Sequence, residues 1–232
     1  MQGQQAAGSA EDFAGLRRTA IECQIRPFGV TDQHILGSFL EIPREKFVPA
    51  GFEPVAYADI ELIHPLAGRK GGRAMLQPLV LARLMQAADV GPADRVLDVA
   101  GATGYTAAVL SGFAGSVVAL ESDEALSKAA AANFEALGLS SAQAVCGPLA
   151  DGCAAKGPFD VIVVNGAAEQ GMDRLIAQLA QGGRMVLLKP HATSASRAFV
   201  YRKDGDAVSE RALFEAAGKA IPEFAAPPAF VF

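Results

Sequence analysis

The sequence lacks several features that would define its class at once. It has no tryptophan, only three cysteines and three histidines in 232 residues, and a charged fraction of only 19%. No apolar run reaches the roughly 18 residues that a membrane-spanning helix needs. The cysteines are odd in number and widely spaced, so we expect neither a disulfide framework nor a metal site. The net charge of −5 comes with no basic stripe, which argues against a nucleic-acid-binding protein.

The first ten residues also lack the charged start and apolar run of a secretory signal peptide. They are rich in Gln, Ala and Gly, so we expect a flexible tail over residues 1–10. Together with the unpaired cysteines, this favours a reducing, cytoplasmic location.

What the sequence does have is apolar residues, which make up 51% of it, with alanine at 46 positions. This composition excludes a disordered or fibrous protein, and the length fits one continuous core. We expect a helical cap over residues 11–90 and an α/β domain over residues 91–232, forming one structural unit.

Strand-like and helical segments alternate from residue 94 onward. Apolar runs predict strands at 95–99, 116–121, 142–146, 159–165 and 184–189, and helical spacing predicts helices at 103–113, 123–137 and 172–180. Alternation of this kind is typical of a parallel sheet covered on both faces. Two further strand-like segments, 197–203 and 207–214, flank Asp204-Gly205-Asp206, which predicts a C-terminal antiparallel hairpin.

The N-terminal part is predicted to be mainly helical. Apolar spacing predicts a helix over residues 11–25, capped by Ser9, a second helix beginning after Thr31, and a third over residues 79–88. The stretch 43–73 is rich in Pro, Gly and charge, yet its aromatic residues indicate that it packs against the rest. Its basic cluster, Arg69, Lys70 and Arg73, is expected to be solvated or to attract an acidic peptide.

The first predicted strand of the α/β part runs into a turn of small residues, Asp98-Val-Ala-Gly-Ala-Thr-Gly-Tyr105. Small residues let a ligand approach the backbone and leave the N–H groups of the following helix free. The next strand ends at Glu121, where a carboxylate can accept two hydrogen bonds from a ribose diol. Ligands of open parallel sheets bind at this edge.

Three interpretations of the turn remain open. A dinucleotide site needs Gly-x-Gly-x-x-Gly, and no third glycine falls in register after Gly101 and Gly104. A site for S-adenosylmethionine needs less, since that cofactor has no pyrophosphate, and it fits the turn, Glu121 and the terminal hairpin better. A purely structural turn would also use small residues, with Asp98 orienting it and Glu121 as a solvated strand end.

Longer motifs resemble one family in particular. Ile42-Pro-Arg-Glu-Lys-Phe-Val-Pro49 and Ala56-Tyr-Ala-Asp59 look like the N-terminal signature of the protein-L-isoaspartate (D-aspartate) O-methyltransferases. The segments 96–110 and 159–168, and Gly182-Gly-Arg-Met-Val186, are similar to its strand motifs. The resemblance covers nearly the whole chain from Phe13.

The resemblance implies a Rossmann-like methyltransferase fold with a mostly parallel seven-stranded sheet. It also implies S-adenosylmethionine as cofactor and damaged proteins or peptides carrying isoaspartate as substrates. The methyl ester formed then cyclises to a succinimide that can reopen as aspartate. The cofactor-binding residues implied are Asp98, Ala100, Gly101, Ala102, Gly104, Glu121, Ser122, Leu149 and Asn165. The substrate-loop residues implied are Tyr57, Asp59, Met75, Leu76, Gln77 and Pro78.

Three positions depart from the family pattern. Leu76 stands where the family has a hydroxyl beside the reacting carboxylate, in a loop that here reads Ala74-Met-Leu-Gln-Pro78. Ala100 and Ala102 stand where the family has glycines. Pro148 replaces an aspartate that meets the adenine amine, although Leu149 can still flank the ring.

These departures leave three hypotheses: an isoaspartyl methyltransferase, a catalytically impaired or non-catalytic binding protein on the same scaffold, or a methyltransferase with another, more apolar acceptor. Tyr57 and Asp59 either line the substrate cleft or pin a loop. His64 is expected to be structural or exposed.

Overall fold

The computed structural model describes residues 10–66, 72–190 and 196–226 of the chain. The expected tail, the Ser9 cap, Arg69 and Lys70 lie outside these residues. The helices are α1 (Ala10–Ala20), α2 (Gln33–Glu41), α3 (Pro78–Ala88), α4 (Tyr105–Leu110), α5 (Glu124–Ala136) and α6 (Asp173–Ala177). The strands are β1 (Leu62–Pro65), β2 (Gly72–Met75), β3 (Arg95–Val99), β4 (Ser116–Glu121), β5 (Ala142–Cys146), β6 (Phe159–Ala167), β7 (Leu179–Lys189), β8 (Ser196–Asp204) and β9 (Ala207–Ala216).

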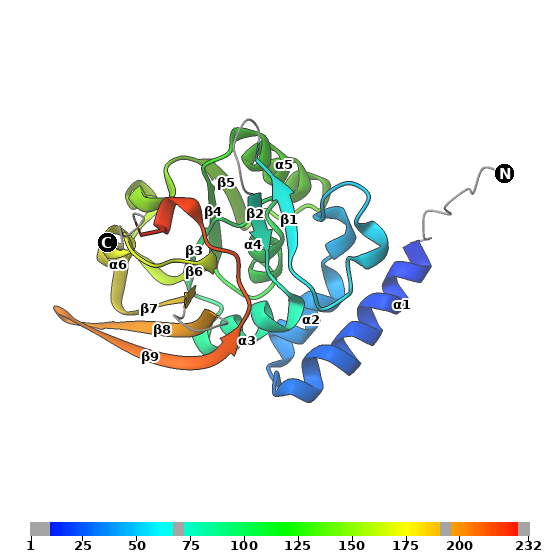
Figure 1. Ribbon diagram of the computed structural model, residues 1–232, viewed down its shortest axis with the longest axis horizontal. Coiled ribbons are helices and arrows are strands. Elements are labelled where there is room, and N and C mark those ends of the chain that lie inside the picture. Colours follow the sequence, from blue (N-terminus) through cyan, green and yellow to red (C-terminus); the bar gives the residue numbers. More distant parts are fainter. Residues whose placement is uncertain (1–9, 67–71, 191–195, 227–232) are drawn as a thin grey trace, which may run out of the picture.

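Seven strands form the central sheet in the order β5-β4-β3-β6-β7-β8-β9. The first five in this order are parallel, whereas β8 and β9 run antiparallel to their neighbours. The expected hairpin is confirmed, and it extends from the body of the molecule on the side opposite to α1 (Figure 1). The strand order reverses between β3 and β6, so the carboxyl ends of these two strands mark the place where a ligand site is expected.

Apolar side chains cover both faces of the sheet, as near-continuous apolar strands require. One face packs against α2–α5, with Val96, Val161 and Val186 in the interface. The other packs against α6 and the C-terminal turn Pro222–Phe224, with Leu97 and Ile162. None of the helices in the described part of the chain combines the length and hydropathy that crossing a bilayer requires.

The N-terminal helices form largely as expected, with one correction to a cap. Asp32, and not Thr31, caps α2, because its Oδ1 accepts hydrogen bonds from the backbone N–H groups of His34 and Ile35. The first helix continues after Ala20 as a π-helical turn, Ile21–Ile25.

A two-stranded antiparallel sheet, β1–β2, lies within the stretch that the sequence showed only as packed and irregular. All four residues of β2 are buried. This corrects the expectation for Arg73, which is 1% exposed and not part of a solvated loop.

The predicted helix 172–180 is also too long. Helix α6 ends at Ala177, and residues 179–183 already belong to β7. The two glycines Gly182 and Gly183 therefore lie inside the strand segment, before its well-paired part begins at Arg184.

Candidate functional site

The turn after β3 has a backbone conformation that alanine adopts with difficulty. Ala100 and Ala102 have φ angles of 62° and 54°, both in the left-handed region, and Gly104 has a φ of 91°. The turn is closed by a hydrogen bond of 2.9 Å from the Gly104 N–H to the Gly101 carbonyl. A Cβ atom at Gly101 would overlap the carboxylate of Asp98. The turn thus needs small residues, and its two alanines are strained by the cost of a Cβ at positive φ.

Asp98 and Asn165 meet at the switch point of the sheet, at the ends of β3 and β6. The Asn165 amide donates to Asp98 Oδ1 over 2.5 Å and to the Val99 carbonyl over 3.0 Å, while Thr106 donates to Asn165 Oδ1 over 2.6 Å. Asp98 Oδ2 is buried without a hydrogen-bond partner. Burial raises the pKa of Asp98 to about 7, against the opposing effect of the Asn165 hydrogen bond.

Glu121 lies at the end of β4 and is buried. Its carboxylate accepts hydrogen bonds from the Arg73 guanidinium and from backbone N–H groups, among them that of Ala102 at 3.3 Å. Glu121 is the residue predicted from the sequence to bind a ribose, and the structure adds the Arg73 guanidinium beside it. Arg73 lies on β2, opposite His64 in the register of β1 with β2, and these two strands were not predicted from the sequence.

A pocket of about 360 Å³ opens beside the end of β5. Its lining consists of Ser122, Gly147, Pro148, Leu149, Ala150 and Glu223. Two predicted cofactor residues, Ser122 and Leu149, therefore face one space. Glu223, from the C-terminal turn, also lines this pocket, and no sequence pattern predicted it.

Four of the predicted substrate-loop residues, Met75, Leu76, Gln77 and Pro78, lie at the start of α3 and just before it. Pro78 is the first residue of α3 and Gln77 its N-cap, while Met75 and Leu76 are buried in the core. Asp59 accepts a hydrogen bond of 3.0 Å from the Leu79 N–H and so pins this helix start.

A buried arginine supports this loop. Arg44 donates to the Ala56 carbonyl and the Leu76 carbonyl, both over 2.9 Å, and stacks over the Tyr105 ring at 4.8 Å. Burial lowers the pKa of the Arg44 guanidinium and lowers that of His64 to about 4. His64 is thus neutral at pH 7. Its burial fits a structural role, which is one of the two roles expected for this residue.

Tyr57 holds together a second part of the N-terminal helical cap (residues 11–90). Its hydroxyl donates to Glu45 and accepts a hydrogen bond of 2.8 Å from Arg17. Burial and the Glu45 hydrogen bond raise the pKa of Tyr57 above its usual range. The contacts of Tyr57 and Asp59 in the structure thus fit the loop-pinning role.

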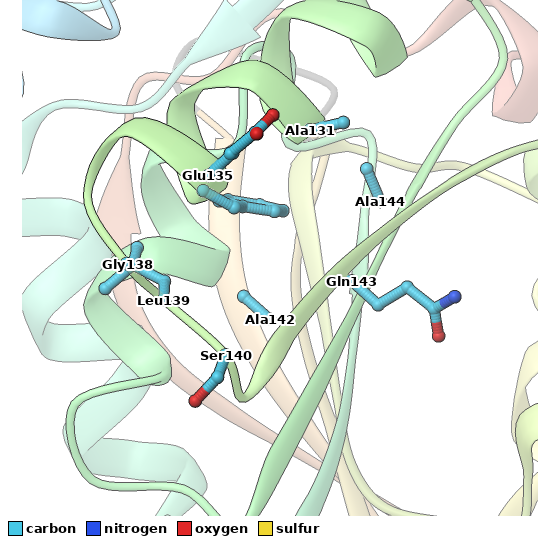
Figure 2. A pocket seen from close by; sticks show the side chains of 9 residues that line it. Ala131, Glu135, Gly138, Leu139, Ser140, Ala142, Gln143 and Ala144 are labelled. Atoms are coloured by element: carbon cyan, nitrogen blue, oxygen red, sulfur yellow. The ribbon is translucent and has the colours of Figure 1, made fainter.

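A second, larger pocket of about 460 Å³ lies between α5 and the edge strand β5 (Figure 2). Phe134 and Leu139 contribute apolar surface to it. None of the predicted site residues lines this pocket, so it is separate from the carboxyl edge of the sheet.

The topology, the tight turn and the acidic residue ending β4 define a Rossmann-like protein of the methyltransferase class. The chain matches the family described as protein-L-isoaspartate(D-aspartate) O-methyltransferase over residues 17–217, and it belongs to this family.

Individual relatives agree with this assignment. Protein-L-isoaspartate O-methyltransferase of Koribacter versatilis is 40% identical over 175 residues, covering 75% of this chain and 77% of the relative. That of Roseiflexus castenholzii is 36% identical, covering 76% and 78%. A solved protein-L-isoaspartate O-methyltransferase superposes with a TM-score of 0.79 at 29% identity, covering 90% of this chain and 67% of the other.

A further structure shares the fold. It is described as a Plasmodium falciparum β-aspartate methyltransferase in complex with S-adenosyl-L-homocysteine, and it superposes with a TM-score of 0.72 at 16% identity. It covers 91% of this chain and 98% of the other.

Proposed function

We propose that this protein is an S-adenosylmethionine-dependent carboxyl O-methyltransferase that acts on isoaspartyl residues of damaged proteins. The observation that carries the proposal is the family match over residues 17–217, which includes both the turn at the switch point and the loop before α3. Its substrates are isoaspartyl proteins or peptides, and its place of action is the cytoplasm. The cap (11–90) and the sheet domain (91–232) act as one unit.

The residues at the turn fit this cofactor. The unpartnered Oδ2 of Asp98 is a buried acceptor that suits an ammonium group, and the turn lets a ligand approach the backbone closely. The pocket between Ser122 and Leu149 has apolar walls that suit an adenine ring. When bound, S-adenosylmethionine supplies an electrophilic methyl group on a sulfonium centre.

The protein's own contribution is binding, alignment and exclusion of water. A substrate carboxylate is ionised at pH 7, so no general base is needed. The buried Met75 and Leu76 keep the loop before α3 apolar, and Arg44 holds the Leu76 carbonyl in place. A dry, fixed site of this kind promotes an in-line displacement by orientation.

Transfer of a tritiated methyl group from S-adenosylmethionine to a peptide tests the proposal, with the isoaspartyl peptide and its aspartyl isomer run side by side. We expect label in the isoaspartyl peptide only. Gly101→Ala should abolish transfer, because the added Cβ overlaps Asp98. Gly37→Ala, on α2 with no atom within 4 Å of the added Cβ, should not change it. Transfer no greater than with heat-killed protein at saturating cofactor would refute the proposal.

A further inference from the structure

Arg73 reaches from β2 into the carboxyl edge of the main sheet. Its guanidinium is buried and forms a two-point contact with Glu121: Nε lies 2.9 Å from Oε2, and Nη2 lies 2.9 Å from Oε1. Paired contacts of this geometry are among the strongest hydrogen bonds in proteins. The two side chains come from different sheets, 48 positions apart in the chain.

The carboxylate of Glu121 has no acceptor capacity left. Besides Arg73, its Oε1 accepts from the backbone N–H groups of Ser122 at 2.8 Å and Asp123 at 3.2 Å, and its Oε2 from that of Ala102 at 3.3 Å. An ionised carboxylate offers about four lone-pair sites. The hydroxyl groups of a ribose therefore cannot donate to Glu121, their predicted partner, unless one of the present donors leaves it.

A third residue holds Arg73 from the side of the pocket. Glu223 Oε1 accepts from Arg73 Nη2 over 3.0 Å and from the Ser122 hydroxyl over 2.8 Å. The Arg73 guanidinium lowers the pKa of Glu223, although burial opposes it. Two carboxylates thus share one guanidinium at the edge of the 360 Å³ pocket that Ser122 and Glu223 line.

We propose that Arg73 is an internal competitor for the cofactor site: it contacts Glu121 in the structure and must leave this carboxylate when a ribose binds there. This inference rests on the proposed function and deepens it, because cofactor binding then requires that Arg73 be displaced from Glu121. Arg73 lies three residues before Leu76, on the strand that leads directly into the loop before α3.

Calorimetric titration with S-adenosylhomocysteine tests the competition. If the Glu121-free state makes up about a tenth of the protein, the apparent affinity is reduced about tenfold, and Arg73→Gln should restore it. Arg73→Lys, which keeps the positive charge but cannot form the two-point contact with Glu121, should tighten binding to a smaller extent. Because Arg73→Lys keeps a cation beside Glu121, it keeps the test valid if Arg73→Gln does not fold.

The matched control is Arg197→Gln. Arg197 forms an ion pair of 2.9 Å with Glu215 on the β8–β9 hairpin, so the same change in charge is made outside the site, and affinity should stay within about twofold. Weaker binding by folded Arg73→Gln would show that Arg73 supports the cofactor site, and unchanged binding would show that Arg73 has no effect on it. Either result would overturn the competition while leaving the proposed function intact. Failure of the wild type and every variant to bind would overturn both.

Discussion

Asn165 donates its amide to one oxygen of the Asp98 carboxylate and leaves the other buried and unpartnered. Asp98 and Asn165 lie near the carboxyl ends of the neighbouring parallel strands β3 and β6, and the strand order reverses between these two strands. Their contact therefore depends on this topology. Burial raises the pKa of Asp98 to about 7, from an ordinary value of 3.8. The hydrogen bond from Asn165 opposes this shift and does not cancel it.

The raised pKa of Asp98 predicts a dependence of stability on pH. Between about pH 4 and pH 7 the unfolded chain has released this proton while the folded chain keeps it, so the free energy of unfolding falls as pH rises through this window. At about 1.36 kcal/mol per pKa unit the effect is on the order of 4 kcal/mol. Urea unfolding of the wild type and of Asp98→Asn at several pH values measures it.

The difference between the unfolding free energies of the wild type and Asp98→Asn, followed over pH, separates the contribution of Asp98 from that of the other carboxylates. Asp98→Asn should be the less pH-dependent of the two, with the gap closing below pH 4. Parallel profiles would show that Asp98 has the same pKa in the folded and unfolded protein, and would contradict the prediction.

The strained alanines give a second prediction. Ala100→Gly and Ala102→Gly each relieve a Cβ at positive φ, worth roughly 1–2 kcal/mol, while losing a buried methyl group and backbone entropy of similar size. We expect each to change the free energy of unfolding by less than about 0.5 kcal/mol. Urea denaturation gives the values.

Ala132→Gly is the matched control for this pair. Ala132 is exposed in the middle of α5, so glycine there should cost about 1 kcal/mol through helix propensity alone. A cost at Ala100 or Ala102 as large as at Ala132 would mean that packing of the methyl group outweighs the backbone strain.

The sheet and its turn followed from the sequence because each depends on a local pattern. Apolar runs predicted five strands of the main sheet, and the turn Asp204-Gly205-Asp206 between two strand-like segments predicted the other two. The small residues after Asp98 predicted a turn, and its two alanines have positive φ. The predicted end of α6 was wrong, because β7 begins at Leu179, which pairs with Phe159 although it continues the helical spacing.

The Arg73 contacts could not be predicted, because they join residues far apart in the chain. A basic residue near Arg69 and Lys70 is most simply solvated, and only the pairing of β1 with β2 buries it. Its partners Glu121 and Glu223 are 48 and 150 positions away, and no spacing rule relates such positions.

A third prediction concerns Leu76, which stands where the family resemblance implies a hydroxyl. Leu76→Ser should raise the rate of methyl transfer to an isoaspartyl peptide, because a hydrogen bond to a carboxylate is worth about 1.5–3 kcal/mol, or roughly tenfold to a hundredfold in rate. It should also lower stability, since Leu76 is only 2% exposed.

Leu76→Ala removes the same core contacts without supplying a hydroxyl, at a typical cost of about 2–5 kcal/mol. The rate of the serine variant relative to this alanine variant therefore measures the hydroxyl itself. Equal rates would show that the loop binds the carboxylate by other groups.

Leu149 supplies the last prediction, because it lines the 360 Å³ pocket and is buried against the sheet. Leu149→Ala should weaken binding of S-adenosylhomocysteine, by about tenfold if the lost contacts are worth about 1.4 kcal/mol. It should also destabilise the fold by about 2–5 kcal/mol. Leu175→Ala is the control, since Leu175 is buried in the same core on α6 without lining the pocket. Both variants should lose similar stability, and only Leu149→Ala should lose affinity. Equal losses of affinity would mean that Leu149 acts through stability alone and that the adenine ring lies elsewhere.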